Sequence, residues 1–141
     1  MELTAHLSDE RRARVEARLQ TNLMAWLTTV SPKGSPDSVP VWFVVRDDDS
    51  ILVYSQSGKT KLRNIESNPR VALGLDVTDI GSDIIRFEGS ATRVAGHPRA
   101  DEVPEYSAKY AERAAAIFGT VERFAELYPE AIVIAPSRLH A

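Results

Sequence analysis

The stretch that decides the fold is DSVPVWFVVRDDDSILVYSQSGKTKLRNI, residues 37–65, which changes along its length from strand to strand to helix. Residues 37–45 and 51–55 are rich in β-branched and aromatic side chains, and a charged turn at 46–49 separates them. After Gly58 the apolar period changes from two to about four, because Leu62 and Ile65 share one helical face. The stretch therefore predicts two strands followed by a short helix, which ends at Asn68-Pro69.

The rest of the chain extends this pattern on both sides. Ser8 is a predicted N-cap, and Leu7, Val15 and Leu19 fall on one face of the helix that follows it. Further strands are predicted at 22–30, 71–77, 84–94 and 131–135, with a turn at 78–82 and a bulge at Gly89. Two apolar stripes near the C-terminus predict helices, at 103–117 and 121–128, with Gly119 between them.

Six strands joined mostly by short turns indicate a mainly β protein, an antiparallel barrel with helices at its ends and rim. A chain of 141 residues fits a single domain over residues 1–141. The strand at 37–45 is unusual because both of its faces are apolar, and an apolar second face needs a cover. A partner subunit, a flat aromatic ligand or the C-terminal helices would each provide one. The two faces are Val39, Val41, Phe43 and Val45 on one side, and Pro40, Trp42 and Val44 on the other.

Composition limits the functions that are possible. The formal net charge of −3 argues against a general nucleic-acid binder, which normally carries a basic excess. The absence of cysteine excludes disulfides, thiol catalysis and cysteine-ligated metals. The N-terminus has no apolar signal core and no stretch approaches 18 apolar residues, so we expect a cytoplasmic protein that is not inserted in a membrane.

The basic stretch after residue 55 has the Gly58-Lys59-Thr60 ending of a phosphate-binding P-loop. The second glycine that a P-loop requires is replaced by Val53, so a nucleotide-binding loop is excluded. The ingredients of an anion site remain, because hydroxyls and cations meet the start of a helix. The alternative is a solvated basic helix whose cations pair with Glu66 or Asp76.

In its order of motifs the sequence resembles the pyridoxamine 5′-phosphate oxidase-like split β-barrels. The resemblance is carried by SPDSVPVWF at 35–43, SQSGKTKLRNI at 55–65, NPRVAL at 68–73, RFEGSATRV at 86–94 and IAPSR at 134–138. It covers roughly residues 8–138, and it is strongest toward the actinobacterial branch of oxidoreductases that use the deazaflavin F-420 or FMN. The fold expected from it is a six-stranded split barrel that binds FMN or a related cofactor.

The resemblance implies a homodimer with two cofactors held between the subunits, and it gives the anion an identity, the cofactor phosphate. Lys61 matches the phosphate-contacting lysine of the family and Lys59 a frequently basic neighbour. Ser57 and Gly58 fall in the loop that meets the phosphate, Arg63 adds a third cation, and Asn64 is carried over only as a nearby residue. The strand that approaches the tricyclic ring is matched by Val39, Pro40, Val41 and Trp42.

The function that these expectations favour is hydride transfer from F-420 to a small electron-poor substrate such as an enone or a quinone. We expect no catalytic side chain, because the cofactor carries the chemistry. We expect no metal site either, because His6, His97 and His140 are scattered. FMN is the second cofactor, and a carrier without turnover is an alternative function. A nucleic-acid binder that stacks bases on Trp42 and Phe43 is a further alternative, although these two residues alternate across their strand.

Overall fold

A computed structural model describes residues 1–77 and 80–141. The turn expected at 78–82 therefore lies partly outside the described residues. A short 3₁₀ turn, η1 (Glu2–Thr4), precedes helix α1 (Asp9–Thr21). Ser8 caps α1 as predicted, because its hydroxyl accepts the Arg11 backbone N–H at 3.3 Å. Val15 and Leu19 are buried and Leu7 packs beside them, so this helix closes one end of the core.

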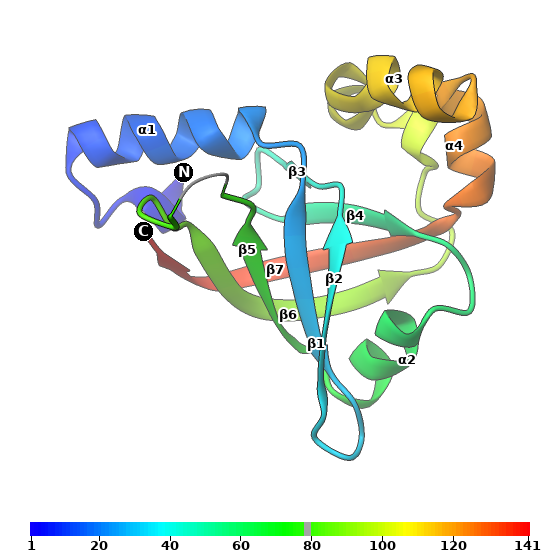
Figure 1. Cartoon of the computed structure of the whole chain (residues 1–141), viewed down its shortest axis with the longest axis horizontal. Coiled ribbons are helices and arrows are strands. Elements are labelled where there is room, and N and C mark those ends of the chain that lie inside the picture. Colours follow the sequence, from blue (N-terminus) through cyan, green and yellow to red (C-terminus); the bar gives the residue numbers. More distant parts are fainter. Residues whose placement is uncertain (78–79) are drawn as a thin grey trace.

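The strands form one antiparallel sheet with the order β2-β1-β5-β6-β7-β4-β3, which curls into a split barrel (Figure 1). The predicted fold is thus confirmed. The strands are β1 (Ala25–Val30), β2 (Pro36–Val41), β3 (Val44–Val45), β4 (Ile51–Ser55), β5 (Arg70–Leu75), β6 (Arg86–Val94) and β7 (Glu130–His140).

The structure has seven strands where six were expected, because the predicted strand at 37–45 is divided. Its first part, β2, pairs with β1, and its second part, β3, pairs with β4. These two parts lie at opposite ends of the sheet order, yet only Trp42 and Phe43 connect them. We call these two residues the seam. Such a short connection requires the sheet to curl until its two edges meet.

The two apolar faces of residues 39–45 bury themselves in two different cores. Val41 and Phe43 belong to the barrel core, with Val39 and Val45 packed against it. Val44 belongs to a second core, with Trp42 packed at its margin. This second core is made by the C-terminal helices, so they provide the cover that the sequence left open. They are α3 (Pro104–Phe118) and α4 (Val121–Leu127), which follow the 3₁₀ turn η2 (Ala100–Glu102).

Several details differ from the expected pattern. Ile117, placed on the buried stripe of α3, is 63% exposed. The last strand is longer than predicted and includes Arg138 and His140.

The bulge at Gly89 is confirmed by a shift of register between Glu88 and Gly89. A Cβ on Gly89 would lie 2.5 Å from the Ala135 carbonyl oxygen, so the bulge where β6 pairs with β7 requires glycine.

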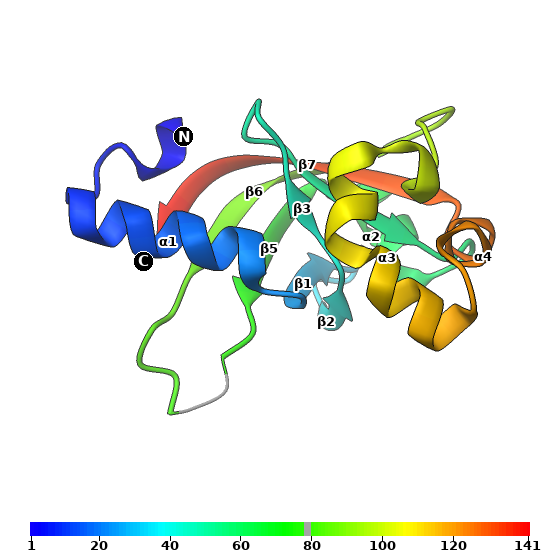
Figure 2. The ribbon, with the colours of Figure 1, turned by 90° about the horizontal axis from the view of Figure 1, so that it is seen from above.

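The remaining helix, α2 (Thr60–Ser67), covers the end of the barrel opposite α1 (Figure 1). It buries Leu62 and Ile65 in the barrel core. Viewed from above, β3 passes between α1 and α3, and both helices contact it (Figure 2). Within residues 1–77 and 80–141, no helix is long and apolar enough to cross a membrane.

Candidate functional site

The candidate site begins where β4 ends and α2 starts. We call residues 56–59 between them the anion loop. Gly58 has a φ of 73°, in the left-handed region that favours glycine. No side chain caps the first turn of α2, whose N-cap residue is Lys59. Backbone N–H groups at this helix end are thus available to a ligand, with the positive end of the helix dipole behind them.

Lys59 and Lys61 are the two cations that the structure leaves free at this loop. Lys59 is exposed and Lys61 is half-buried. Burial lowers the pKa of Lys61, the positive charge of Lys59 lowers it further, and Asp37 opposes both effects. Among the described residues neither lysine has a carboxylate within 4.0 Å, and the pairing with Glu66 or Asp76 is absent. An anion bound here would relieve the repulsion between the two lysines.

Arg63 was predicted as the third cation of the anion site, and two of its donors are already engaged. One guanidinium nitrogen donates to the Gly58 carbonyl at 3.0 Å and another to the Thr60 hydroxyl at 3.2 Å. The side chain therefore folds back on the turn that carries the loop. Its charge stays close to the site while its hydrogen bonds stabilise the loop itself.

Ser57 is also held by a protein partner. Its hydroxyl donates to Glu130 Oε1 at 3.1 Å, and Arg93 Nε donates to Glu130 Oε2 at 2.5 Å. Glu130 and Arg93 come from the start of β7 and the end of β6. This contact could not be predicted from the sequence, because Arg93 and Glu130 are 37 residues apart and meet only through the strand register.

Asn64 proves to be an anchor for α2. It is 3% exposed, and its amide donates to the hydroxyl of Thr29 on β1 at 3.0 Å, which is buried as well. A buried polar pair of this kind fixes position, because either group alone would be left without a partner. Asn64 thereby sets α2 against β1 and does not face the anion loop's solvent side.

The edge of β2 offers backbone groups beside this helix. Ser31 N–H donates to the Ser35 carbonyl at 2.9 Å in the turn before β2, which sets the alternation of the ladder with β1. Val39 and Val41 therefore direct their polar groups to β1, while Ser38 and Pro40 direct theirs outward. Proline fits an outward position because it has no N–H to donate. Of the four predicted ring-contacting residues, Pro40 is exposed, whereas Val39 and Val41 point into the barrel.

Trp42 points away from this edge into an aromatic cluster. Its ring stacks on Tyr110 at 4.8 Å between centroids and on Phe124 at 5.1 Å. Phe43 is fully buried. The structure therefore contradicts the stacking of bases on Trp42 and Phe43, and the hypothesis of a nucleic-acid binder no longer has these two rings to support it.

The seam is fixed by two side chains of α3 for which the sequence predicted no such role. The Tyr110 hydroxyl accepts the Phe43 N–H at 2.8 Å and lies 2.9 Å from the carbonyls of Leu23 and Phe43. The Lys109 ammonium donates to the Phe43 carbonyl at 2.8 Å and to the Leu19 carbonyl at 3.3 Å. It also lies 3.9 Å from the centroid of the Phe43 ring. Burial lowers the pKa of Lys109 to about 8.

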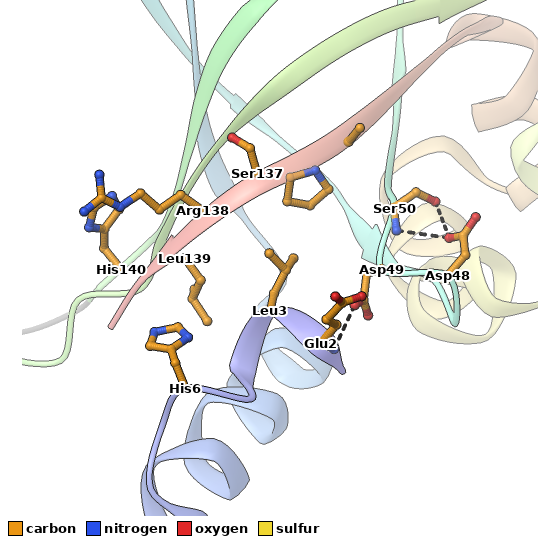
Figure 3. A pocket seen from close by; sticks show the side chains of 12 residues that line it. Glu2, Leu3, His6, Asp48, Asp49, Ser50, Ser137, Arg138, Leu139 and His140 are labelled. Atoms are coloured by element: carbon orange, nitrogen blue, oxygen red, sulfur yellow. Dashed lines mark hydrogen bonds between the residues drawn. The ribbon is translucent and has the colours of Figure 1, made fainter.

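A hollow of about 910 Å³ lies elsewhere, between η1, the β3–β4 turn and the end of β7 (Figure 3). Several of its polar groups already have protein partners. Asp49 accepts the Glu2 N–H at 3.0 Å, and Asp48 accepts the Ser50 N–H at 3.0 Å and its hydroxyl at 2.6 Å. His140 pairs with Glu88, which lowers the pKa of that carboxyl. We therefore place the candidate site at the anion loop.

Two tyrosines on the buried face of α3 are enclosed by other side chains. Tyr106 and Tyr110 are fully buried among aromatic rings, so neither hydroxyl is open to a substrate as a proton donor. Across residues 1–77 and 80–141, no three histidine or carboxylate side chains are placed to hold a metal ion.

Comparison with known proteins identifies the family. The family described as "Pyridoxamine 5'-phosphate oxidase" matches residues 12–139. The chain belongs to the pyridoxamine 5'-phosphate oxidase family. It is 30% identical over 110 residues to the pyridoxine/pyridoxamine 5'-phosphate oxidase of Rubrobacter xylanophilus, covering 72% of this chain and 50% of that protein. The chain thus spans about half the length of this curated relative.

Solved structures of the same family fold are also similar. A putative pyridoxamine 5'-phosphate oxidase from Listeria innocua has a TM-score of 0.66 at 18% identity, covering 91% of this chain and 94% of the other. An F-420 reductase has a TM-score of 0.65 at 21% identity, covering 89% and 94%. HutZ, a haem storage protein of Vibrio cholerae, has a TM-score of 0.65 at 17% identity, covering 92% of each chain. At these identities the likeness shows the fold alone.

Proposed function

We propose that this member of the family is an oxidoreductase that binds F-420 and transfers a hydride to a small electron-poor substrate such as an enone or a quinone. The observation that carries the proposal is the anion loop, where two lysines that have no carboxylate partner among residues 1–77 and 80–141 meet an uncapped helix end. These groups fit the phosphate of a flavin-type cofactor. The bound cofactor would supply the hydride chemistry.

The roles of the chain's own residues follow from their positions. Lys59, Lys61 and the first N–H groups of α2 would bind the phosphate. The outward backbone groups of Ser38 and Pro40 would border the cofactor's ring. Asp37 of β2 lies close enough to Lys61 to act on its pKa, which supports a role for Lys61 near this strand. No side chain is asked to act as a nucleophile.

FMN is the alternative cofactor, and the same loop would take it. F-420 continues beyond its phosphate as an anionic tail, and Lys59 lies on the open surface where such a tail could run. The preference for F-420 rests on two free cations and not on three, because Arg63 is engaged in the loop. A carrier without turnover would use the same groups.

Pairing of two copies is part of the proposal. The outer face of β1, β5 and β6 carries a groove of about 470 Å³. Its lining includes the small residues Thr28, Ala72 and Ser90 and the charged residues Arg70 and Glu88. The small side chains would allow another chain to approach closely. A second copy on this face would bring its own residues to the edge of β2.

The test is a titration of the purified protein with F-420 and with FMN, followed by anaerobic assays of the reduced cofactor with enones and quinones. Saturable binding of F-420 with oxidation by at least one substrate is the expected result. Tight binding of FMN alone would replace the cofactor, and binding without oxidation by any substrate would favour the carrier. If neither cofactor binds at micromolar concentration, the proposal is wrong.

A further inference from the structure

The anion loop is attached to the mouth of the barrel by a carboxylate. We infer that Glu130, held by Arg93, is a positioning residue that fixes the anion loop for binding, and this inference rests on the proposed function. It runs against simple electrostatics, because Glu130 places a negative charge beside a site that is proposed to bind an anion.

Strand pairing explains how Glu130 reaches the loop. Ser55, the last residue of β4, pairs with Glu130, and Arg93 on β6 pairs with Ile132 on β7. Ile132 is fully buried in the barrel core, so side chains on its face of the sheet point into the barrel. Glu130 and Arg93 therefore lie at the mouth of the barrel, next to residues 56–59.

The carboxylate of Glu130 is well enclosed and stays ionised. Its side chain is 19% exposed, compared with 40% for Arg93. The hydrogen bond from Arg93 lowers the pKa of Glu130, and the bond from Ser57 lowers it further. Arg93 thus offsets the charge that would otherwise repel a phosphate.

The consequence for Ser57 is specific. Its hydroxyl proton is committed to Glu130 at 3.1 Å, so it is not free to donate to an anion. The other side of the loop is tied by Arg63, which donates to the Gly58 carbonyl. With both sides held, the loop is ordered before any ligand arrives, and binding costs less conformational entropy. The anion then meets lysines and backbone N–H groups.

The test compares Glu130→Ala, Ser57→Ala and the double variant, with F-420 and FMN as probes. Loss of one ordinary hydrogen bond predicts about three- to tenfold weaker binding in each single variant. The double variant should bind no more weakly than the weaker single variant, because both changes remove the same bond. Charge removal alone predicts tighter binding by Glu130→Ala, so equal or tighter binding overturns the inference.

Two controls distinguish this inference from other causes of weaker binding. Glu126→Ala removes an exposed carboxylate that pairs with Arg123 on α4, and it should leave affinity unchanged. Ser57→Ala keeps the Arg93–Glu130 pair, so it reports on the loop even if Glu130→Ala does not fold. Weaker binding in Glu126→Ala as well would show that the loss of affinity is not specific to the contact between Glu130 and the anion loop, and it would overturn the inference.

Amide hydrogen exchange without ligand gives a reading that does not depend on the cofactor. Exchange of residues 56–60 should become faster in both single variants, while that of β1 and β5 stays unchanged. Unchanged exchange at 56–60 would overturn the inference. If neither probe binds the unmodified protein, the proposed function fails, whereas the exchange experiment still reports whether Glu130 holds the loop.

Discussion

Replacing Lys61 by Met should weaken cofactor binding without destabilising the protein. The side chain is half-buried, its pKa is lowered by burial and by Lys59, and it has no carboxylate within 4.0 Å among the described residues. Methionine preserves most of the apolar stem and removes the charge. In the free protein, removal of this partly desolvated charge should not lower the free energy of unfolding, and should raise it by at most about 1 kcal/mol.

The ligand-bound state should respond in the opposite direction. A charge-assisted hydrogen bond to phosphate contributes about 1.5–3 kcal/mol, which corresponds to a roughly ten- to hundredfold weaker Kd in Lys61→Met. Kd is measured by fluorescence titration with F-420 and FMN, and the free energy of unfolding by urea denaturation at pH 7. Lys33→Met, in the exposed turn before β2, is the matched control and should change neither quantity.

Two outcomes would refute this reasoning. A Kd unchanged in Lys61→Met would mean that the anion does not bind at this loop. A fall in stability larger than about 1 kcal/mol, with affinity falling in parallel, would mean that Lys61 has a structural partner and that its repulsion from Lys59 is not a cost.

Three further predictions concern the supports of the site. Tyr106→Phe should leave stability unchanged or raise it, because the Tyr106 hydroxyl is buried and has no hydrogen-bond partner in the described part of the chain. Tyr110→Phe should cost about 1–3 kcal/mol by leaving the Phe43 N–H unpaired. Urea denaturation of both variants checks this, and a larger loss in Tyr106→Phe would contradict it. Since burial lowers the pKa of Lys109 to about 8, the unfolded chain binds more protons than the folded one between about pH 8 and 10.5, so stability should rise with pH over that window. Lys109→Met should abolish this rise in the urea midpoint, and a rise that persists would exclude Lys109 as its source. Gly58→Ala should cost about 1 kcal/mol through backbone strain alone, because nothing lies within 4 Å of the added Cβ; a loss above about 2 kcal/mol would show that the loop packs more tightly than its geometry implies.

Sequence patterns predicted most of the strands because their signals are local. Alternation over residues 71–75 and the basic turn at Gly58 reflect nearest-neighbour geometry, which a single sequence displays directly. The division of residues 37–45 could not be predicted from the sequence, because one continuous strand and two strands joined by a two-residue seam show the same apolar alternation. What divides it is tertiary: Tyr110 and Lys109, more than sixty residues away, satisfy the backbone of Phe43 in place of a neighbouring strand.

For the candidate site, too, local features could be predicted from the sequence and tertiary contacts could not. The cations and the glycine of the anion loop could be read from the residues, since their chemistry is that of single side chains. Their engagement could not, because it depends on register: Arg63 turns back on its own helix, whereas Glu130 reaches Ser57 only once β4 and β7 are paired. A sequence therefore overstates the number of free charges at such a site.

The seam also determines how the edge of β2 can recognise a ligand. Val39 and Val41 face the barrel core and Trp42 is stacked in the aromatic cluster, so three of the four expected contact residues have their side chains committed elsewhere. Recognition along this edge must therefore rely on backbone groups, whose placement depends on the seam. Because Lys109 and Tyr110 hold both polar groups of Phe43, a change at either residue would move the edge without altering any atom that touches a ligand. Position 42 then contributes through packing, and Trp42→Phe, which keeps a ring between Tyr110 and Phe124, should preserve binding far better than Trp42→Ala.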